Sequence, residues 1–336
     1  MSGFARRLSG EWRRRGWAVR GESVLLAVSG GADSLALMLG VEELLKAGLL
    51  GVEVTVAHLD HGLRGERGAD DARWVGGRAG ESGFKVLTGR ASVGGRDNLE
   101  QAARRARYEF LAAAAREAGA SSVLVAHTLD DQAETVLLRL LRGSGADGLA
   151  GMSPERTLEG EVTLRRPLLA WARRADTEEY CRARGVVPRA DEMNEDEGFA
   201  RVRVRRRLLP LLETFNPRAT EALARAADLL REDAAALESA AARLLEEARA
   251  DSAEGAAERG GPLRVEVLKA APAAHRRRAL RRWLADGRGD LRRVEMAHLL
   301  AVERLLEGAR GGRVAELPGG SRVERRRGLL LFHPAA

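Results

Sequence analysis

The chain has 336 residues, 45% of them hydrophobic and only 4% aromatic, and its formal net charge is +7. The length predicts two domains with aliphatic cores, and the positive charge predicts a polyanionic partner, nucleic acid first. A bias toward arginine, paired with the 49 acidic residues, explains the charge equally well. The single cysteine, Cys181, excludes a disulfide framework, a cysteine metal cluster within the chain and a cysteine pair for sulfur transfer. No run is apolar enough to span a membrane, so we expect a soluble cytoplasmic protein.

The chain begins with a predicted amphipathic helix over residues 3–18. Phe4, Leu8, Trp12 and Trp17 alternate with arginines there. The basic face could contact RNA, but such helices more often pack on their own domain, and packing is the expectation here.

The next stretch is an apolar strand, residues 24–28, followed by a turn and a helix that ends near Gly48. The turn reads Ser29-Gly30-Gly31-Ala32-Asp33-Ser34. Gly30 and Gly31 let a phosphate approach the backbone, and the N–H groups of the turn and the helix N-terminus attract its charge. Asp33 would repel that phosphate, which predicts a Mg²⁺ ion between them. The turn lacks the lysine of the usual P-loop and the spacing of dinucleotide folds, and a turn without a ligand is the alternative.

A second strand, residues 52–58, leads into a loop that contains His58, Asp60 and His61. This grouping could suggest a metal site, but no third cluster with ligand spacing completes it. Loops at the carboxyl ends of parallel strands bind ligands, so we expect residues 58–64 to line a nucleotide pocket. A purely structural loop is the alternative.

A helix over residues 70–82, a strand over 84–88 and a long helix over 98–117 are predicted next. Arg104 and Arg107 share one face of the long helix, beside Tyr108. Such arginines are usually solvated, yet near the pocket they could hold a phosphate of a nucleotide or of RNA.

The fourth strand, residues 122–126, is followed by His127, Asp130, Asp131 and Glu134. Asp130 stands where a helix N-cap is expected, with acids in the first turn. The cluster follows a strand end at the same sheet edge as the glycine turn. It could therefore coordinate Mg²⁺ or bind and deprotonate an amine. A capped helix without a ligand is the alternative.

A short strand ending at Arg165 and a helix over residues 177–184 precede a charged segment. This segment is acidic over residues 191–197 and then basic, with Arg201, Arg203 and Arg205. The two halves could pair with each other. Alternatively, the segment could be mobile, with arginines that meet phosphate when a ligand binds.

Residues 217–250 predict one long helix or a helical hairpin, and residues 252–261 a linker. The remainder predicts a strand over 264–268, helices over 273–284 and 291–307, and strands over 313–317, 321–325 and 329–332. Arg277 and Arg281 belong to a basic face of the first of these helices. We expect this face to contact an RNA backbone rather than only solvent.

Together these elements predict an α/β fold, a doubly wound and mostly parallel sheet followed by a helical spacer and a small α+β domain. The predicted boundaries are 1–216 for a nucleotide-binding catalytic domain, 217–252 for the spacer and 253–336 for the small domain. The small domain is expected to bind RNA.

Several segments resemble the tRNA(Ile)-lysidine synthetases, a family of PP-loop, or N-type, ATP pyrophosphatases. They are SGGADS (29–34), AHLDHGLRG (57–65), NLEQAARRARY (98–108), AHTLDDQAETVLLRLLRGSG (126–145), RPLL (166–169), residues 194–210 and LPGG (317–320). The resemblance implies the adenine nucleotide alpha hydrolase-like fold and ATP with Mg²⁺. It implies that ATP activates C2 of the wobble cytidine of tRNA(Ile) with a CAU anticodon, and that the ε-amine of free L-lysine then displaces AMP. No membrane partner is expected, and a homodimer is the default oligomeric state.

The resemblance also implies roles for the candidate site residues. Asp33, Asp131, His127 and Arg107 would be catalytic, with Asp33 on Mg²⁺. ATP would be bound by Ala27, Ser29, Gly30, Gly31, Ala32, Asp33, Ser34 and His58. The lysine or the tRNA would be bound by Asp130, Glu134, Arg201, Arg203, Arg205, Arg277 and Arg281. A nearby carboxylate or imidazole would accept the proton that lysine loses.

Two features depart from the family pattern. Val202 stands where asparagine is usual, and we expect no counterpart of the further C-terminal domain of longer members. Three alternatives stay open. A PP-loop tRNA thiolase relies on cysteine pairs, and a small-molecule amidating enzyme leaves the basic C-terminal helix unexplained. The third is a non-catalytic RNA-binding protein on the same fold.

Overall fold

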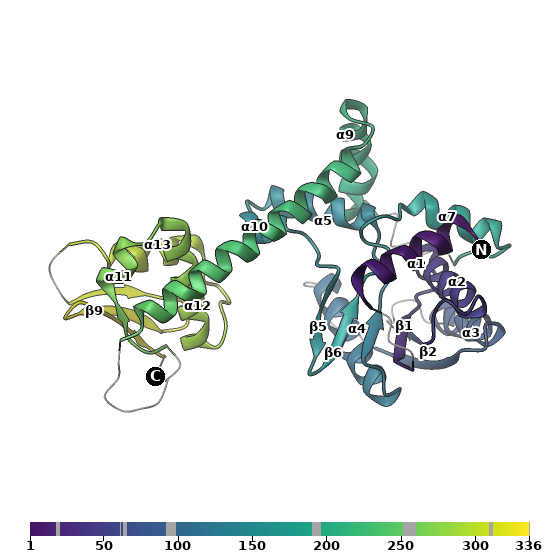
Figure 1. Cartoon of the computed structure of the whole chain (residues 1–336), viewed down its shortest axis with the longest axis horizontal. Helices are drawn as coiled ribbons and strands as arrows, with labels where there is room; N and C mark the ends of the chain where they lie inside the picture. Colours follow the sequence, from purple (N-terminus) through teal and green to yellow (C-terminus); the bar gives the residue numbers. More distant parts are fainter. Residues whose placement is uncertain are drawn as a thin grey trace. The chain divides into compact units, whose positions relative to one another are not determined.

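A computed structural model describes residues 1–17, 21–60, 62, 66–91, 99–189, 196–250, 260–308 and 312–335. The chain forms two compact units, Met1–Leu229 and Leu230–Ala336 (Figure 1). Each has a hydrophobic core and a sheet of its own. Among the described helices, none is both long and apolar enough to cross a bilayer.

The first unit is built on a six-stranded sheet with the order β3-β2-β1-β4-β6-β5. All neighbouring strands run parallel except β5, which pairs antiparallel with β6. The doubly wound, mostly parallel fold predicted from the sequence is confirmed, whereas the edge strand β5 was not predicted. The strands are β1 (Ser23–Ala27), β2 (Glu53–Asp60), β3 (Lys85–Arg90), β4 (Ser122–Leu124), β5 (Glu155–Glu159) and β6 (Val162–Arg165).

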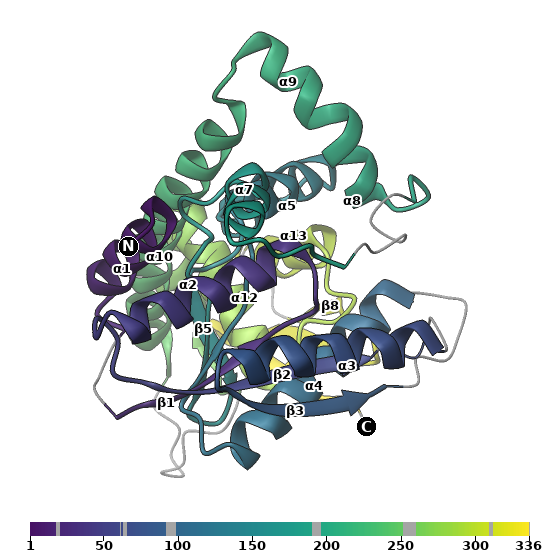
Figure 2. The same cartoon turned by 90° about the vertical axis from the view of Figure 1, so that its right-hand side faces the viewer.

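Helices cover both faces of this sheet because side chains alternate along its central strand. Val24 and Leu26 of β1 pack into one core, and Leu25 packs into the other. Figure 2 shows α2 and α3 on one face of the sheet and α4 on the other. The helices of the first face are α1 (Gly3–Arg15), α2 (Ala32–Lys46), α3 (Glu66–Glu81) and α7 (Arg174–Ala183), and α4 spans Leu99–Glu117 on the second.

Helix α1 packs on its own domain, as predicted. The side chains of Phe4, Leu8, Trp12 and Trp17 are all buried in the first core. Phe4 stacks on Tyr180 of α7, with ring centroids 4.4 Å apart. The aromatic residues of this segment therefore stabilise the fold.

The strand order places one position of the sheet at a topological switch point. Strands β2 and β3 follow β1 on one side, and β4 and β6 lie on the other. Open α/β sheets bind ligands beyond the carboxyl ends of the strands at such a point. The turn after β1 and the segment after β4 therefore meet where a ligand is expected.

Residues beyond α7 are more helical than the sequence predicted. The basic part of the charged segment, for which the sequence left self-pairing and mobility open, is helical. It forms α8 (Ala200–Arg203), a π-helical turn η2 (Val204–Leu208) and α9 (Leu209–Phe215). Val202 and Val204 are buried, which anchors this segment. Of the predicted acidic stretch 191–197, residues 191–195 lie outside the described residues.

Helix α10 (Ala219–Ala248) is a single helix of 30 residues, so the alternative of a helical hairpin is wrong. It begins in the first compact unit and ends in the second. The linker predicted over 252–261 falls outside the described residues except for its last two.

The second unit packs α11, α12, α13 and the C-terminal half of α10 on an antiparallel sheet with the order β7-β10-β9-β8. The strand predicted over 264–268 is wrong, because a helix begins at Val265. Val265 and Leu268 are both buried, and a spacing of three residues puts two side chains on one face of a helix but on opposite faces of a strand. The elements are β7 (Leu263–Arg264), α11 (Val265–Ala270), α12 (Ala273–Arg288), α13 (Met296–Arg304), β8 (Arg313–Glu316), β9 (Arg322–Arg326) and β10 (Leu329–His333).

Candidate functional site

The glycine turn joins β1 to α2, and its backbone conformation at residue 30 favours glycine. Gly30 has a φ angle of +93°, which disfavours any L side chain. Gly31 is the N-cap of α2 and offers no side-chain oxygen to the first N–H groups of the helix. Those N–H groups and the helix dipole form a site that attracts an anion.

Two serines hold the turn in place. The Ser29 N–H donates to the Ser34 hydroxyl oxygen at 3.1 Å, and the Ser34 hydroxyl donates to the Gly31 carbonyl at 3.0 Å. The Gly30 carbonyl accepts from the Arg189 N–H at 3.0 Å. The shape of the turn is therefore set before any ligand arrives.

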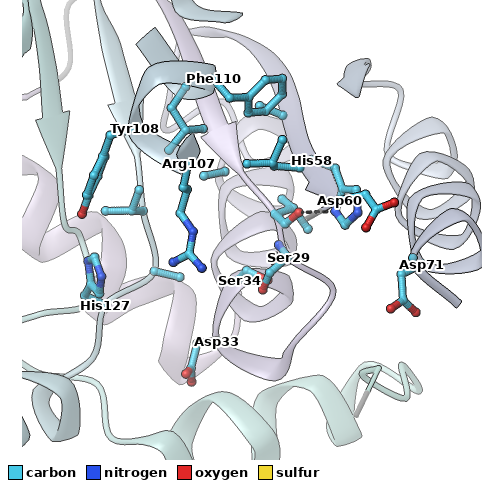
Figure 3. A pocket seen from close by; sticks show the side chains of 18 residues that line it. Ser29, Asp33, Ser34, His58, Asp60, Asp71, Arg107, Tyr108, Phe110 and His127 are labelled. Atoms are coloured by element: carbon cyan, nitrogen blue, oxygen red, sulfur yellow. Dashed lines mark hydrogen bonds between the residues drawn. The ribbon is translucent and has the colours of Figure 1, made fainter. Parts of the chain in front are cut away.

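A cavity of about 290 Å³ opens beside the turn (Figure 3). Figure 3 shows side chains from the ends of β1, β2 and β4 and from α4 gathered around it. Seven of the predicted site residues line this cavity: Ala27, Ser29, Asp33, Ser34, His58, Arg107 and His127. The sequence had placed these residues on separate segments, and the switch point of the sheet brings them together.

His58 presents a hydrogen-bond acceptor at the wall of the cavity. Its side chain is buried, and Nδ1 lies 2.8 Å from the Val28 carbonyl oxygen. A carbonyl only accepts, so Nδ1 carries a hydrogen, and in the neutral form of the ring Nε2 keeps its lone pair. The part of the predicted loop that contains His61, Leu63 and Arg64 lies outside the described residues.

The negative charge of Asp33 is only weakly balanced by nearby positive groups. Burial raises its pKa to about 6, and the nearby Asp131 and Asp130 add to this, against the opposing effects of Thr177 and Arg174. The Thr177 hydroxyl donates to Oδ1 at 2.5 Å, and Arg174 Nε lies 3.7 Å from Oδ2. Such a carboxylate fits a Mg²⁺ ion, which commonly takes one or two protein carboxylates together with phosphate oxygens. Within the described residues, no group of three or more His, Cys, Asp or Glu side chains could hold a metal alone.

The N-cap predicted at Asp130 is wrong. Helix α5 (Leu129–Leu141) is capped by Thr128, whose hydroxyl accepts from the Asp131 N–H at 3.4 Å. Asp131 Oδ2 in turn accepts from the Thr128 N–H at 2.8 Å, which completes a capping box. Asp130 is the second residue of the helix, two positions after the N-cap. Its carboxylate accepts hydrogen bonds from the Arg174 N–H at 2.9 Å and from Arg173 Nε at 3.1 Å.

Four acids beside the cavity are matched by four arginines, a group called the acid–arginine cluster below. The acids are Asp33, Asp130, Asp131 and Glu134, and the arginines are Arg173, Arg174, Arg201 and Arg205. The cluster unites α2, α5, α7, α8 and η2. Asp130 and Glu134, which the sequence predicts to bind substrate, both accept hydrogen bonds from these arginines.

Glu134 is the centre of the cluster. Its side chain is fully buried, and it accepts from Arg174 Nη1, Arg201 Nε and Arg205 Nε at 2.7 to 2.8 Å. Asp131 accepts from Arg174 at 2.8 Å and from Arg201 at 3.1 Å. Burial alone would raise the pKa of both carboxyl groups, but the arginines outweigh it and lower both values.

The remaining predicted arginines lie elsewhere. Arg203 donates to the carbonyls of Glu197 and Gly198. In the second unit, Arg277 of α12 pairs with Glu303 of α13 at 2.8 Å, while Arg281 lies one turn further along α12. The arginines on the basic face of α12 therefore form ion pairs with acidic residues of other helices. Glu238 of α10, for example, pairs with Arg282 at 3.2 Å.

Sequence reasoning missed four residues of the site, namely Arg166, Arg173, Arg174 and Thr177. One signal was present, because Arg173 and Arg174 stand at the N-terminus of a helix, where the helix dipole disfavours positive charge. Such a placement indicates carboxylates nearby. Arg166 was quoted only as part of a motif, and its partners are distant in the sequence.

Comparison with known proteins gives two family matches. A PP-loop domain matches residues 6–212, and the TilS substrate binding domain matches residues 263–331. A U34-tRNA thiolase from Methanococcus maripaludis has the same fold with 17% identity and a TM-score of 0.57, over 68% of this chain and 80% of that chain.

Curated relatives match most of the chain. The tRNA(Ile)-lysidine synthase of Geobacter sulfurreducens is 40% identical over 85% of this chain and 59% of the relative. That of Thermus thermophilus is 42% identical over 93% and 57%, and that of Leifsonia xyli is 41% identical over 94% and 90%. The chain thus spans less than two thirds of the first two relatives and nine tenths of the third.

Proposed function

The chain belongs to the tRNA(Ile)-lysidine synthase family, and we propose that it converts the wobble cytidine of tRNA(Ile) with a CAU anticodon to lysidine. The C2 oxygen of the cytosine attacks the α-phosphorus of ATP, and pyrophosphate leaves. The ε-amine of free L-lysine then attacks C2 and loses its proton, the C2–O bond breaks, and AMP leaves with that oxygen. The observation that carries the proposal is the shared cavity that Asp33 of the glycine turn and His127 of the β4 end both line.

ATP is proposed to bind in this cavity. The pre-shaped turn at residues 29–34 and the N-terminus of α2 suit its outer phosphates. Mg²⁺ is proposed to be held by Asp33, where it would offset charge on the departing pyrophosphate. Arg107 lines the same cavity and suits a phosphate oxygen.

Lysine is proposed to approach the acid–arginine cluster. Asp131 and Glu134 are its two buried carboxylates, and a lysine ammonium would have to share them with Arg174 and Arg201. Asp130 of α5 joins the cluster by accepting a hydrogen bond from the Arg174 N–H of α7. The binding of lysine is therefore expected to weaken as salt rises.

The tRNA is proposed to contact Arg201 and Arg205 of the acid–arginine cluster, Arg203 beside them in the sequence, and Arg277 and Arg281 in the second unit. We assign catalysis to residues 1–216, a spacer to 217–252 and tRNA binding to 253–336. The match of residues 263–331 to a substrate binding domain supports the last assignment. The cytoplasmic location and the homodimer stay predictions.

The rival functions have less support. A thiolase of the kind that relies on cysteine pairs is disfavoured by the lone Cys181, which is also fully buried. A small-molecule amidating enzyme would have no use for a substrate binding domain of the lysidine synthase type. A non-catalytic RNA-binding protein would not need Asp33 and His127 at one cavity.

The experiment is a pyrophosphate-release assay with ATP, Mg²⁺ and a tRNA(Ile) transcript, with and without lysine. Lysine should be required for turnover, and a transcript with uridine at the wobble position should release none. Asp33→Asn should abolish release, while Asp70→Asn, an exposed carboxylate on α3 that pairs with Arg73, should not change it. Equal release with both transcripts, or an active Asp33→Asn variant, would reject the proposal.

A further inference from the structure

Arg166 makes a contact that fixes the protonation of His127. It follows β6, and its side chain is buried. Arg166 Nε lies 3.2 Å from His127 Nδ1, and Arg166 Nη1 donates to the Ser153 carbonyl at 2.6 Å. A guanidinium has only donors, so His127 Nδ1 must accept. A neutral imidazole that accepts at Nδ1 carries its hydrogen on Nε2.

The charges around His127 keep the ring neutral. Burial lowers its pKa to about 3; Asp131 of α5 opposes this, while Arg166, Arg201 of α8 and Arg104 of α4 lower it further. Arg166 is itself held by a hydrogen bond with Tyr108, so its guanidinium is fixed from two sides. The imidazole is therefore uncharged near neutral pH.

The uncharged ring faces the cavity. His127 lines it together with Asp33, Arg107 and Ser34. Figure 3 shows His127 and Arg107 on neighbouring sides of this space, with Asp33 below them. The only polar hydrogen that the ring can offer to this space is the one on Nε2.

We propose that Arg166 is a positioning residue that holds His127 as a neutral Nε2–H donor, and that this donor binds an α-phosphate oxygen of ATP. The proposal rests on the proposed function for the identity of its ligand. It means that His127 accepts no proton from lysine, so that this task falls to a carboxylate. A neutral donor of this kind stabilises an oxygen whose negative charge grows in the transition state, without adding a proton to it.

The first test is an NMR spectrum of the ligand-free full chain labelled with ¹⁵N and ¹³C at its six histidines. His127→Gln assigns the His127 signals by their loss. We expect the Nε2–H tautomer, with no titration between pH 5 and pH 8. An Nδ1–H tautomer, or a titration midpoint in that range, would overturn the proposal.

The second test adds α,β-methylene ATP with Mg²⁺ to the same sample. The Nε2–H proton of His127 should shift downfield as it forms the new hydrogen bond. Unchanged His127 signals at a saturating concentration of this analogue would overturn the assignment of its ligand.

The third test compares Arg166→Met with Arg165→Met. Arg165 is a neighbouring, largely buried arginine that donates to the Trp17 carbonyl and has no contact with His127 among the described hydrogen bonds. Arg166→Met should let His127 titrate, mix its tautomers and lower kcat for pyrophosphate release at least tenfold, with a new loss of activity below pH 6.5. Arg165→Met should leave the His127 signals unchanged. An unaltered His127 spectrum in Arg166→Met would reject the role of Arg166.

These tests separate the inference from the proposed function. The tautomer is read without substrate, so a correct tautomer in a protein that makes no lysidine would leave only the function rejected. Lysidine formation by a protein whose His127 carries its proton on Nδ1 would reject only the inference. If Arg166→Met does not fold, the spectrum of the unmodified chain still decides the tautomer.

Discussion

The Thr177 hydroxyl donates a hydrogen bond of 2.5 Å to Oδ1 of Asp33, across 144 residues of sequence. The contact ties α7 to the first turn of α2, and Cys181 adds a second tie to the Ala32 carbonyl at 3.5 Å. Asp33 is therefore aimed by a helix that precedes the charged segment, not by the glycine turn alone. Orienting contacts of this kind set how well a site is organised before its ligand binds.

Replacing Thr177 by valine tests this orientation. Thr177→Val removes the hydroxyl and keeps the shape, and a hydrogen bond to a charged group contributes about 1.5–3 kcal/mol. We expect pyrophosphate release to slow by about tenfold or more, and Thr177→Ser, which keeps the hydroxyl, to stay close to the unmodified rate. Equal rates for the valine and serine variants would show that the contact has no role in catalysis.

Glu134 should be the most costly carboxylate to neutralise. Glu134→Gln leaves Arg174, Arg201 and Arg205 facing one another in a buried place, so the free energy of unfolding should fall by about 3–5 kcal/mol. Glu221→Gln is the matched control, because Glu221 pairs only with Arg173 among the described ion pairs and is 35% exposed. We expect the control to cost about 1 kcal/mol or less. Urea unfolding curves measure both, and similar losses for the two variants would contradict the account of the cluster.

The two glycines of the turn should respond differently to alanine. Gly30→Ala places a side chain at a φ angle of +93°, with Arg189 and Val75 atoms 3.5 Å from the new Cβ, and should cost about 1–3 kcal/mol of stability. Gly31→Ala has an ordinary φ angle of −73° and only Ser29 Oγ nearby, at 3.6 Å. It should fold normally but raise KM for ATP, because its methyl group stands where a phosphate is proposed to lie. An unchanged KM in Gly31→Ala would contradict that position of the phosphate.

His127 should make the protein less stable in acid. Its pKa is about 3 in the folded chain and 6.5 in the unfolded chain, so only the unfolded chain binds this proton between those values. The stability contributed by the neutral ring is complete above pH 6.5 and is lost as pH falls toward 3, by at most about 1.4 kcal/mol per pH unit.

The measurement is the free energy of unfolding of the unmodified chain and of His127→Gln at pH 7 and pH 4.5. The unmodified chain should lose about 2–3 kcal/mol more than the variant over this range. Parallel pH curves would show that His127 titrates normally in the folded chain.

The parts of the site that could be predicted from the sequence are those that are contiguous in it. The strand, the glycine turn and Asp33 lie within 14 residues, and strand order alone brings His58 and His127 to the same edge. The helix that begins at Val265 was mistaken for a strand, because so short an apolar run is compatible with both the helix repeat and the strand repeat. Such runs are settled by packing partners, which are distant in the sequence.

The arginine contacts could not be predicted, for a similar reason. Arg174 meets Asp33 across 141 residues, and Arg201 meets Glu134 across 67. Nothing local distinguishes these arginines from the many others of a chain with 56 basic residues. The segment of Arg201 was expected to be mobile or self-paired. Arg207 does pair with Glu197 of the acidic half, but Arg201 lies in a helical turn that is bound to α5 through the buried carboxylate of Glu134.

The central claim is that the adenylyl group passes to the C2 oxygen of the wobble cytidine. The most direct measurement uses a tRNA(Ile) that carries ¹⁸O at this single position, with ATP, Mg²⁺ and lysine, followed by mass spectrometry of the released AMP. The account predicts one ¹⁸O atom in each AMP that accompanies a lysidine. Lysidine formation with AMP that carries no ¹⁸O would contradict it.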